Sequence, residues 1–127
     1  MGTRYLHGMH LVHAIRNGKT VEQFLGGFDH AGEKAIRYLT IRSQGDEFWL
    51  HNHEVHDEGS QDYLDLYAFE YLDMPDHRFE PYPIKFNSMG DALRYASAEF
   101  GASEDRWVNN GVVQSEYGDY LRGQNRA

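Results

Sequence analysis

With 127 residues, 40% of them hydrophobic and only three prolines, the chain has the length and composition of one folded domain rather than of a disordered segment. It contains no cysteine and no long apolar run, so we exclude disulfides, thiolate chemistry and a membrane-spanning helix. Its net charge of −8 opposes direct binding to nucleic acids. We expect a single domain over residues 1–127, frayed at 122–127, and a cytoplasmic location because no secretory signal opens the sequence.

The first 25 residues have a mixed pattern. Residues 5–16 combine aliphatic side chains with three histidines at a spacing that fits a strand or a helix, and we favour a strand. Asn17-Gly18 predicts a turn, because both residues tolerate positive φ. Thr20 and Gln23 have capping-box spacing, which favours one or two helical turns over residues 21–25, with a hairpin strand as the alternative.

The middle of the chain predicts an antiparallel meander. Three runs with strand character cover residues 35–42, 47–55 and 62–72. Turn-forming residues separate them, at 44–46 and again at 57–60. We therefore expect three consecutive strands joined by short turns.

The third run, residues 62–72, alternates aliphatic with aromatic or acidic residues. Successive side chains of a strand point to opposite faces, so one face is expected to enter the core. This face carries Leu64, Leu66, Ala68 and Leu72. The opposite face carries Tyr63, Asp65, Tyr67, Phe69 and Tyr71. Residues 74–83 contain all three prolines and predict a loop or an edge segment.

Ser88, followed three residues later by Asp91, predicts the start of a helix that ends at Gly101. Residues 107–113 predict a tight hairpin or a strand entered through a turn, and the aromatic segment 117–121 is expected to pack against the rest. Together the elements predict an α+β fold, an antiparallel β-sheet meander with one main helix packed on one face.

The acidic residues are concentrated in residues 54–80, which hold nine acidic residues and a single basic one, Arg78. This one segment accounts for the whole net charge. Such a surface attracts a basic protein and speeds its association. The alternative is a solvated acidic face that only aids solubility.

Aromatic residues lie among these acids, and this combination is typical of a protein-binding face. The predicted partner-binding residues are Asp57, Glu58, Asp62, Tyr63, Asp65, Tyr67, Glu70, Tyr71 and Asp73. The alternative is that the aromatic residues form a second core layer beneath Trp49 and Tyr38, an interpretation that we favour for Phe69.

A second hypothesis concerns a metal site. Gly45, His51, His53 and Glu58 have a spacing that resembles the first metal-binding motif of the cupin family. The resemblance implies one divalent transition metal held by His51, His53 and Glu58 in a small metal-dependent enzyme. The chain departs from the pattern at Asp65, where cupins have glycine, and it lacks their second motif.

Other catalytic signals are weak. His7, His10 and His13 would share one face of a helix but not of a strand, and no carboxylate accompanies them at a defined spacing. The sequence has no nucleophile elbow. We therefore predict no catalytic residue and, outside the cupin-like alternative, no cofactor.

The succession of a meander, the helix at 88–100 and the segment from Trp107 to Tyr117 resembles small bacterial immunity proteins of contact-dependent and polymorphic toxin systems. The resemblance implies a non-catalytic protein that binds a cognate basic toxin, often a nuclease, and occludes its active site. No binding residue carries over from such divergent families. The hypotheses are thus an immunity-type binder, a cupin-like enzyme, and a regulatory or scaffold domain.

Overall fold

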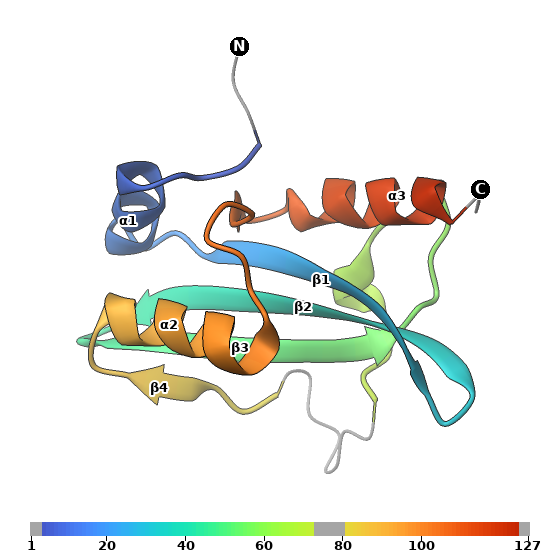
Figure 1. Ribbon diagram of the computed structural model, residues 1–127, viewed down its shortest axis with the longest axis horizontal. Coiled ribbons are helices and arrows are strands. Elements are labelled where there is room, and N and C mark those ends of the chain that lie inside the picture. The colour runs from blue at the N-terminus through green and yellow to red at the C-terminus, as the bar shows by residue number, and fades with distance from the viewer. Residues whose placement is uncertain (1–3, 73–80, 125–127) are drawn as a thin grey trace.

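The computed structural model describes residues 4–72 and 81–124, and Figure 1 shows how its elements are arranged. In chain order they are α1 (Met9–Arg16), β1 (Val21–His30), β2 (Glu33–Gln44), β3 (Glu47–His56), the 3₁₀ turn η1 (Leu66–Ala68), β4 (Ile84–Phe86), α2 (Met89–Phe100), β5 (Val108–Asn109) and α3 (Val113–Gly123). The α+β class is confirmed.

The strands form one antiparallel sheet in the order β4-β3-β2-β1-β5. Strands β1, β2 and β3 make a continuous meander. The predicted meander therefore began one strand too late, with β2, and ended one strand too late, with residues 62–72. The predicted turn at residues 44–46 is confirmed, since Gln44 pairs with Glu47 and Gly45 has a φ of 61°. The two longest strand pairings therefore build the centre of the sheet.

The prediction of helical turns at residues 21–25 is wrong, and the alternative of a hairpin strand is correct. Val21 pairs with Ile41 of β2, and the pairing continues to His30 opposite Glu33, with a bulge after Phe24. The buried partner strand outweighs the local capping signal, because strand propensity expresses tertiary packing more than backbone preference.

The prediction of a strand at residues 5–16 is also wrong, because α1 occupies the last eight of these residues. Leu11, Ala14 and Ile15 are buried at three- and four-residue spacing, as on one face of a helix. The β-type pairing of Tyr5 is an isolated bridge with Val108 rather than part of a strand. Asn17 and Gly18 end the helix, so the turn predicted there is confirmed.

The third predicted strand, residues 62–72, is a loop that contains η1. Leu66 and Phe69 are its buried side chains, and a three-residue interval matches a 3₁₀ turn rather than a strand. Only Tyr71 bridges to β3, at Val55. The alternation of aliphatic and aromatic residues was therefore not the alternation of two strand faces.

The predicted helix at 88–100 is confirmed as α2. The Ser88 hydroxyl accepts a hydrogen bond from the Asp91 backbone N–H at 3.1 Å, and Gly101 ends the helix in the left-handed conformation. Residues 107–113 were predicted less well, because β5 covers only Val108–Asn109 and a turn then leads into α3. The chain thus has three described helices instead of one main helix.

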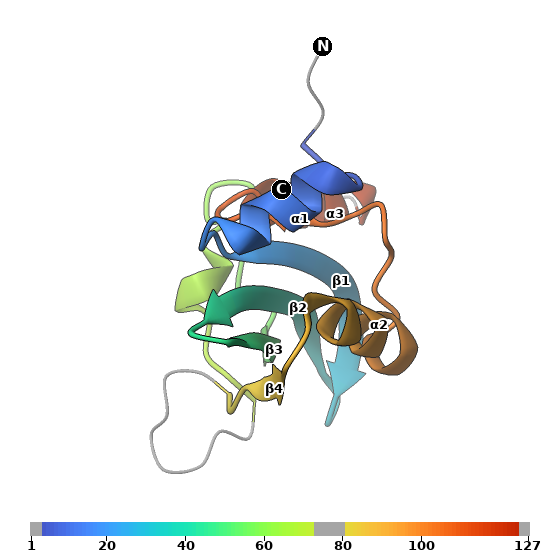
Figure 2. The same cartoon turned by 90° about the vertical axis from the view of Figure 1, so that its left-hand side faces the viewer.

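The sheet is covered on both faces. Figure 2 shows α2 on one side and the light-green segment containing η1 on the other, with α1 and α3 beside β1. One core cluster joins α1 and α2 to Leu39, Ile41 and Leu50. The second joins α3 and η1 to Ile36 and Tyr38. Among the described residues, no helix combines the length and apolar character needed to cross a lipid bilayer.

Candidate protein-binding site on the acidic loop

Residues 57–72, here called the acidic loop, connect β3 to the part of the chain before β4, and they hold most of the predicted partner-binding residues. Two buried side chains anchor the loop to the sheet. Leu66 is fully buried, and Phe69, 2% exposed, packs edge-on against the Tyr117 ring of α3 at 5.5 Å. Phe69 is therefore core, which confirms the alternative interpretation of this residue.

Backbone hydrogen bonds hold both ends of the acidic loop. At its end, the His56 N–H donates to the Glu70 carbonyl at 2.8 Å and the Leu72 N–H donates to the Glu54 carbonyl at 3.0 Å. At its start, the Gly59 N–H donates to the Tyr117 hydroxyl at 3.0 Å. The loop thus has fixed attachments and presents a defined surface.

Gly59 is needed for this attachment. A Cβ at this position would collide with the Tyr117 ring and with the Tyr63 carbonyl. The Tyr117 hydroxyl, which accepts from Gly59, also donates a short hydrogen bond to the Asp57 carboxylate. Asp57 is consequently engaged in holding the loop and is only half-buried.

Four carboxylates of the acidic loop are exposed: Glu58, Asp62, Asp65 and Glu70. Within residues 4–72 and 81–124, none of them lies within 4 Å of a lysine or arginine nitrogen. Their hydrogen bonds are local or weak. The Glu58 carboxylate accepts from the Glu70 N–H, and Asp65 accepts from the Gln114 amide at 3.4 Å.

Arginines bind several carboxylates of β3, α2 and α3, whereas no arginine of the described chain binds any of the four exposed carboxylates of the acidic loop. Glu54 on β3 lies 2.6 Å from the Arg37 guanidinium. Glu116 on α3 is bound by Arg4 at 2.7 Å and by Arg106 at 3.2 Å. The four exposed carboxylates without such a partner make the acidic loop a locally negative part of the described surface.

Two tyrosines of the loop are partly exposed, Tyr63 by 43% and Tyr67 by 40%. The Tyr67 hydroxyl points inward, donating to the Glu22 carboxylate at 2.6 Å and accepting from the Gly111 N–H at 3.0 Å. The hydroxyl is fixed, so the exposed part of the ring can serve as a rigid contact surface. Rigid aromatic rings give contact area at low entropic cost.

Glu22 on β1 is a fully buried carboxylate. Burial raises its pKa, while hydrogen bonds from Tyr67 and from the Gly111 N–H act in the opposite direction. Burial, together with the neighbouring Glu22, raises the pKa of Tyr67, which remains a hydrogen-bond donor. The sequence analysis did not identify Glu22 and Gly111, which fix the Tyr67 hydroxyl. The only available signal was an acidic residue in a strand whose side chain faces the core.

Tyr71 does not offer its hydroxyl to a partner, because the hydroxyl lies 2.7 Å from Nδ1 of His53. The second ring nitrogen of His53 lies 2.9 Å from the Thr40 hydroxyl, and the ring stacks on Tyr38 at 4.4 Å. Burial, with His51 as a further cause, lowers the pKa of His53 to about 3. His53 is thus a neutral, structural residue beneath the end of the acidic loop.

The three residues of the cupin-like hypothesis are not brought together. His51 and His53 are both buried, with ring centroids 5.8 Å apart, as the two-residue spacing on a strand predicts. The carboxylate of Glu58, however, is exposed on the acidic loop and accepts from Glu70. In the part of the chain that the structure describes, no group of three or more His, Asp or Glu residues could hold a metal ion.

The remaining predicted residues do not belong to the acidic loop. Asp73 lies outside the described residues, as does most of the proline-containing segment at 74–83. His10 and His13 are exposed on α1, and His7 lies 3.7 Å from Asp105. The candidate site is therefore the acidic loop with its four exposed carboxylates and two partly exposed tyrosines.

Comparison of the chain with protein-family models, with curated proteins and with solved structures found no match. No relative or structural neighbour therefore informs the function of the chain.

Proposed function

We propose that the chain is a protein-binding module of the immunity type, which neutralises a basic toxin by covering the toxin's active site with the acidic loop. The observation that carries the proposal is the grouping of Glu58, Asp62, Asp65 and Glu70, all exposed and without a lysine or arginine partner in the described chain, on one anchored loop. Exposed charges of one sign steer an oppositely charged protein.

The two exposed tyrosines supply the apolar part of the proposed interface. Tyr63 packs edge-on against the buried Phe69 at 5.3 Å, and Tyr67 is fixed through Glu22. Interfaces commonly derive most of their affinity from a few aromatic anchors surrounded by polar residues. In this proposal the carboxylates speed the encounter, and Tyr63 and Tyr67 slow dissociation.

The loop also suits a nuclease as the target. A nuclease active site that binds phosphates is lined by basic side chains. A row of carboxylates on a fixed backbone can occupy such a site in place of the nucleic acid. Because the loop is held at both ends, little ordering entropy is lost when the complex forms.

The test is protection of growing cells by co-expression with a basic toxin domain encoded beside the gene for this chain. We expect co-expression to restore growth and the two purified proteins to form a stable complex. The variant Asp62→Lys/Asp65→Lys should lose protection, whereas Asp46→Lys/Glu99→Lys, which changes the net charge equally at exposed positions outside the loop, should retain it.

Two outcomes would contradict the proposal. One is that both double variants protect as well as the unaltered chain. The other is that no complex forms with the neighbouring basic protein.

A further inference from the structure

A cleft of about 650 Å³ lies between α1 and α2 and next to the segment that leads to β5. It belongs to the side of the sheet opposite the acidic loop, because its lining includes Leu11 and Trp107 of the α1–α2 core cluster. Its volume is within the range of about 300–1,000 Å³ that is usual for sites of small organic ligands.

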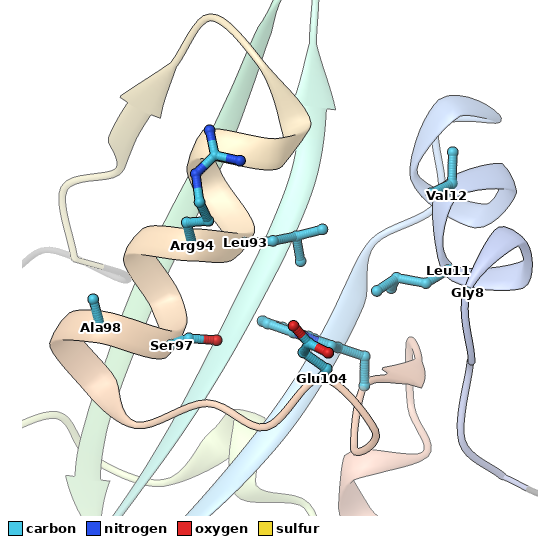
Figure 3. A pocket seen from close by; sticks show the side chains of 9 residues that line it. Gly8, Leu11, Val12, Leu93, Arg94, Ser97, Ala98 and Glu104 are labelled. Atoms are coloured by element: carbon cyan, nitrogen blue, oxygen red, sulfur yellow. The ribbon is translucent and has the colours of Figure 1, made fainter.

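The floor of the cleft is apolar and its rim is polar. Leu11 and Trp107 are 7% and 2% exposed, so they form the floor, and Leu93 of α2 is half-buried beside them. Figure 3 shows Leu93 and Ser97 projecting from α2 toward Leu11 and Glu104. A ligand in the cleft would therefore meet aliphatic and aromatic surface below and a hydroxyl and a carboxylate above.

The cleft has two charged side chains at its rim, and only one of them has an ion-pair partner in the described part of the chain. Arg94 forms an ion pair with Asp91 one turn earlier on α2, and in Figure 3 its side chain extends along α2 toward the start of the helix. Glu104 is exposed, and within the described residues no lysine, arginine or histidine lies within 4 Å of its carboxylate. The uncompensated charge of the cleft is thus negative.

We propose that this cleft binds small apolar amines. The ammonium group pairs with the Glu104 carboxylate and donates to the Ser97 hydroxyl, while the hydrocarbon part packs on Leu11, Leu93 and Trp107. Alkylamines are protonated at neutral pH, as lysine is. An apolar anion would meet Glu104 at the rim, where Arg94 is already paired, and is therefore disfavoured.

The test is calorimetric titration of the full chain with octylamine, octanol and octanoate, which share one hydrocarbon length and differ in head group. We expect octylamine to bind about threefold more tightly than octanol, because an exposed ion pair contributes only a small free energy. Octanoate should bind more weakly than both. Glu104→Gln should remove the advantage of octylamine over octanol. Glu99→Gln, an equal change of charge on an exposed position of α2 outside the cleft, should preserve it.

A second variant tests the location. Ser97 is exposed on α2, so Ser97→Phe fills the cleft at low cost to folding, which an unchanged urea midpoint verifies. We expect it to abolish binding of octylamine and octanol alike. The proposal is overturned if octylamine does not bind the unaltered chain, if octanoate binds at least as tightly, or if Ser97→Phe leaves octylamine binding intact. None of these outcomes bears on the acidic loop.

Discussion

Ala31 has an unfavourable backbone conformation in the turn between β1 and β2. Its φ is 51°, and it precedes Gly32, whose φ is 84°, in a two-residue hairpin loop between His30 and Glu33. Such loops require positive φ at both positions and favour asparagine followed by glycine. We predict that Ala31→Asn raises the free energy of unfolding by about 1 kcal/mol, the approximate cost of a left-handed alanine.

Urea unfolding checks this prediction through a higher midpoint at an unchanged slope. The matched control is Ala98→Asn on the exposed face of α2, where the same exchange lowers stability because asparagine is a weaker helix former. A midpoint for Ala31→Asn at or below that of the unaltered chain would contradict the assigned turn.

His53 makes the stability of the fold depend on pH. Its pKa is lowered to about 3 in the folded protein, so between that value and the ordinary histidine pKa near 6.5 the unfolded chain binds a proton that the folded chain does not. The stabilisation is complete above about pH 6.5 and is lost as the pH falls. We expect the free energy of unfolding to decrease by about 1.4 kcal/mol per pH unit in this window from His53 alone.

Urea unfolding at about pH 7 and about pH 4.5 measures this dependence. His53→Gln should be less stable than the unaltered chain near neutral pH, because it loses the stacking on Tyr38, yet its stability should fall less on acidification. His13→Gln, at an exposed position of α1, should keep the full dependence. An equally steep loss of stability in His53→Gln would show that His53 is not the group responsible.

Among the elements, those with strong local signals were predictable. Three such signals each depend on one or two residues, and each predicted feature is observed. They are the helix cap at Ser88, the end of the helix at Gly101 and the glycine turn after Gln44. Helix α3 was missed because its start follows an Asn-Asn-Gly turn that is typical of hairpins. The sequence signal that could have revealed it is the four-residue spacing of Val113, Tyr117 and Leu121, all of which are buried.

The composition of the acidic loop is visible in the sequence, but its structure could not be predicted. Its charge and its aromatic residues are visible in the sequence, whereas its path depends on partners that are distant in the chain, such as Tyr117 for Gly59 and Glu22 for Tyr67. Local alternation cannot encode such contacts, and residues 62–72 were consequently taken for a strand. The cleft could not be predicted for the same reason, because its walls come from α1 and α2, which are distant in the chain.

The anchoring of the acidic loop gives a prediction at the scale of the element. Leu66 is completely buried, so Leu66→Ala should lower the free energy of unfolding by about 2–5 kcal/mol through lost contacts and a cavity. It should also increase hydrogen exchange of the loop amides. Leu64→Ala, at a half-buried position of the same loop, should have the smaller effect in both measurements. If the two variants are equally mild, Leu66 does not anchor the loop.

At the scale of the whole molecule, the distribution of charge matters more than its sum. The carboxylates of α3 are held by arginines, among them Arg4 and Arg106 on Glu116, while four carboxylates of the acidic loop are exposed to solvent. At physiological ionic strength, interactions between charges are screened beyond about 8 Å. A protein that approaches the acidic loop therefore interacts with the local carboxylates rather than with the net charge of the chain. We propose that the acidic loop, anchored by Leu66, steers the encounter with a basic protein.

The proposed role of the acidic loop is tested most directly by the association rate with the basic toxin domain, recorded by stopped flow at several salt concentrations. We predict that Asp62→Lys/Asp65→Lys associates several-fold more slowly than the unaltered chain, that Asp46→Lys/Glu99→Lys is affected much less, and that the difference shrinks as salt is added. Equal association rates for the two double variants would contradict the assignment of the acidic loop as the binding site.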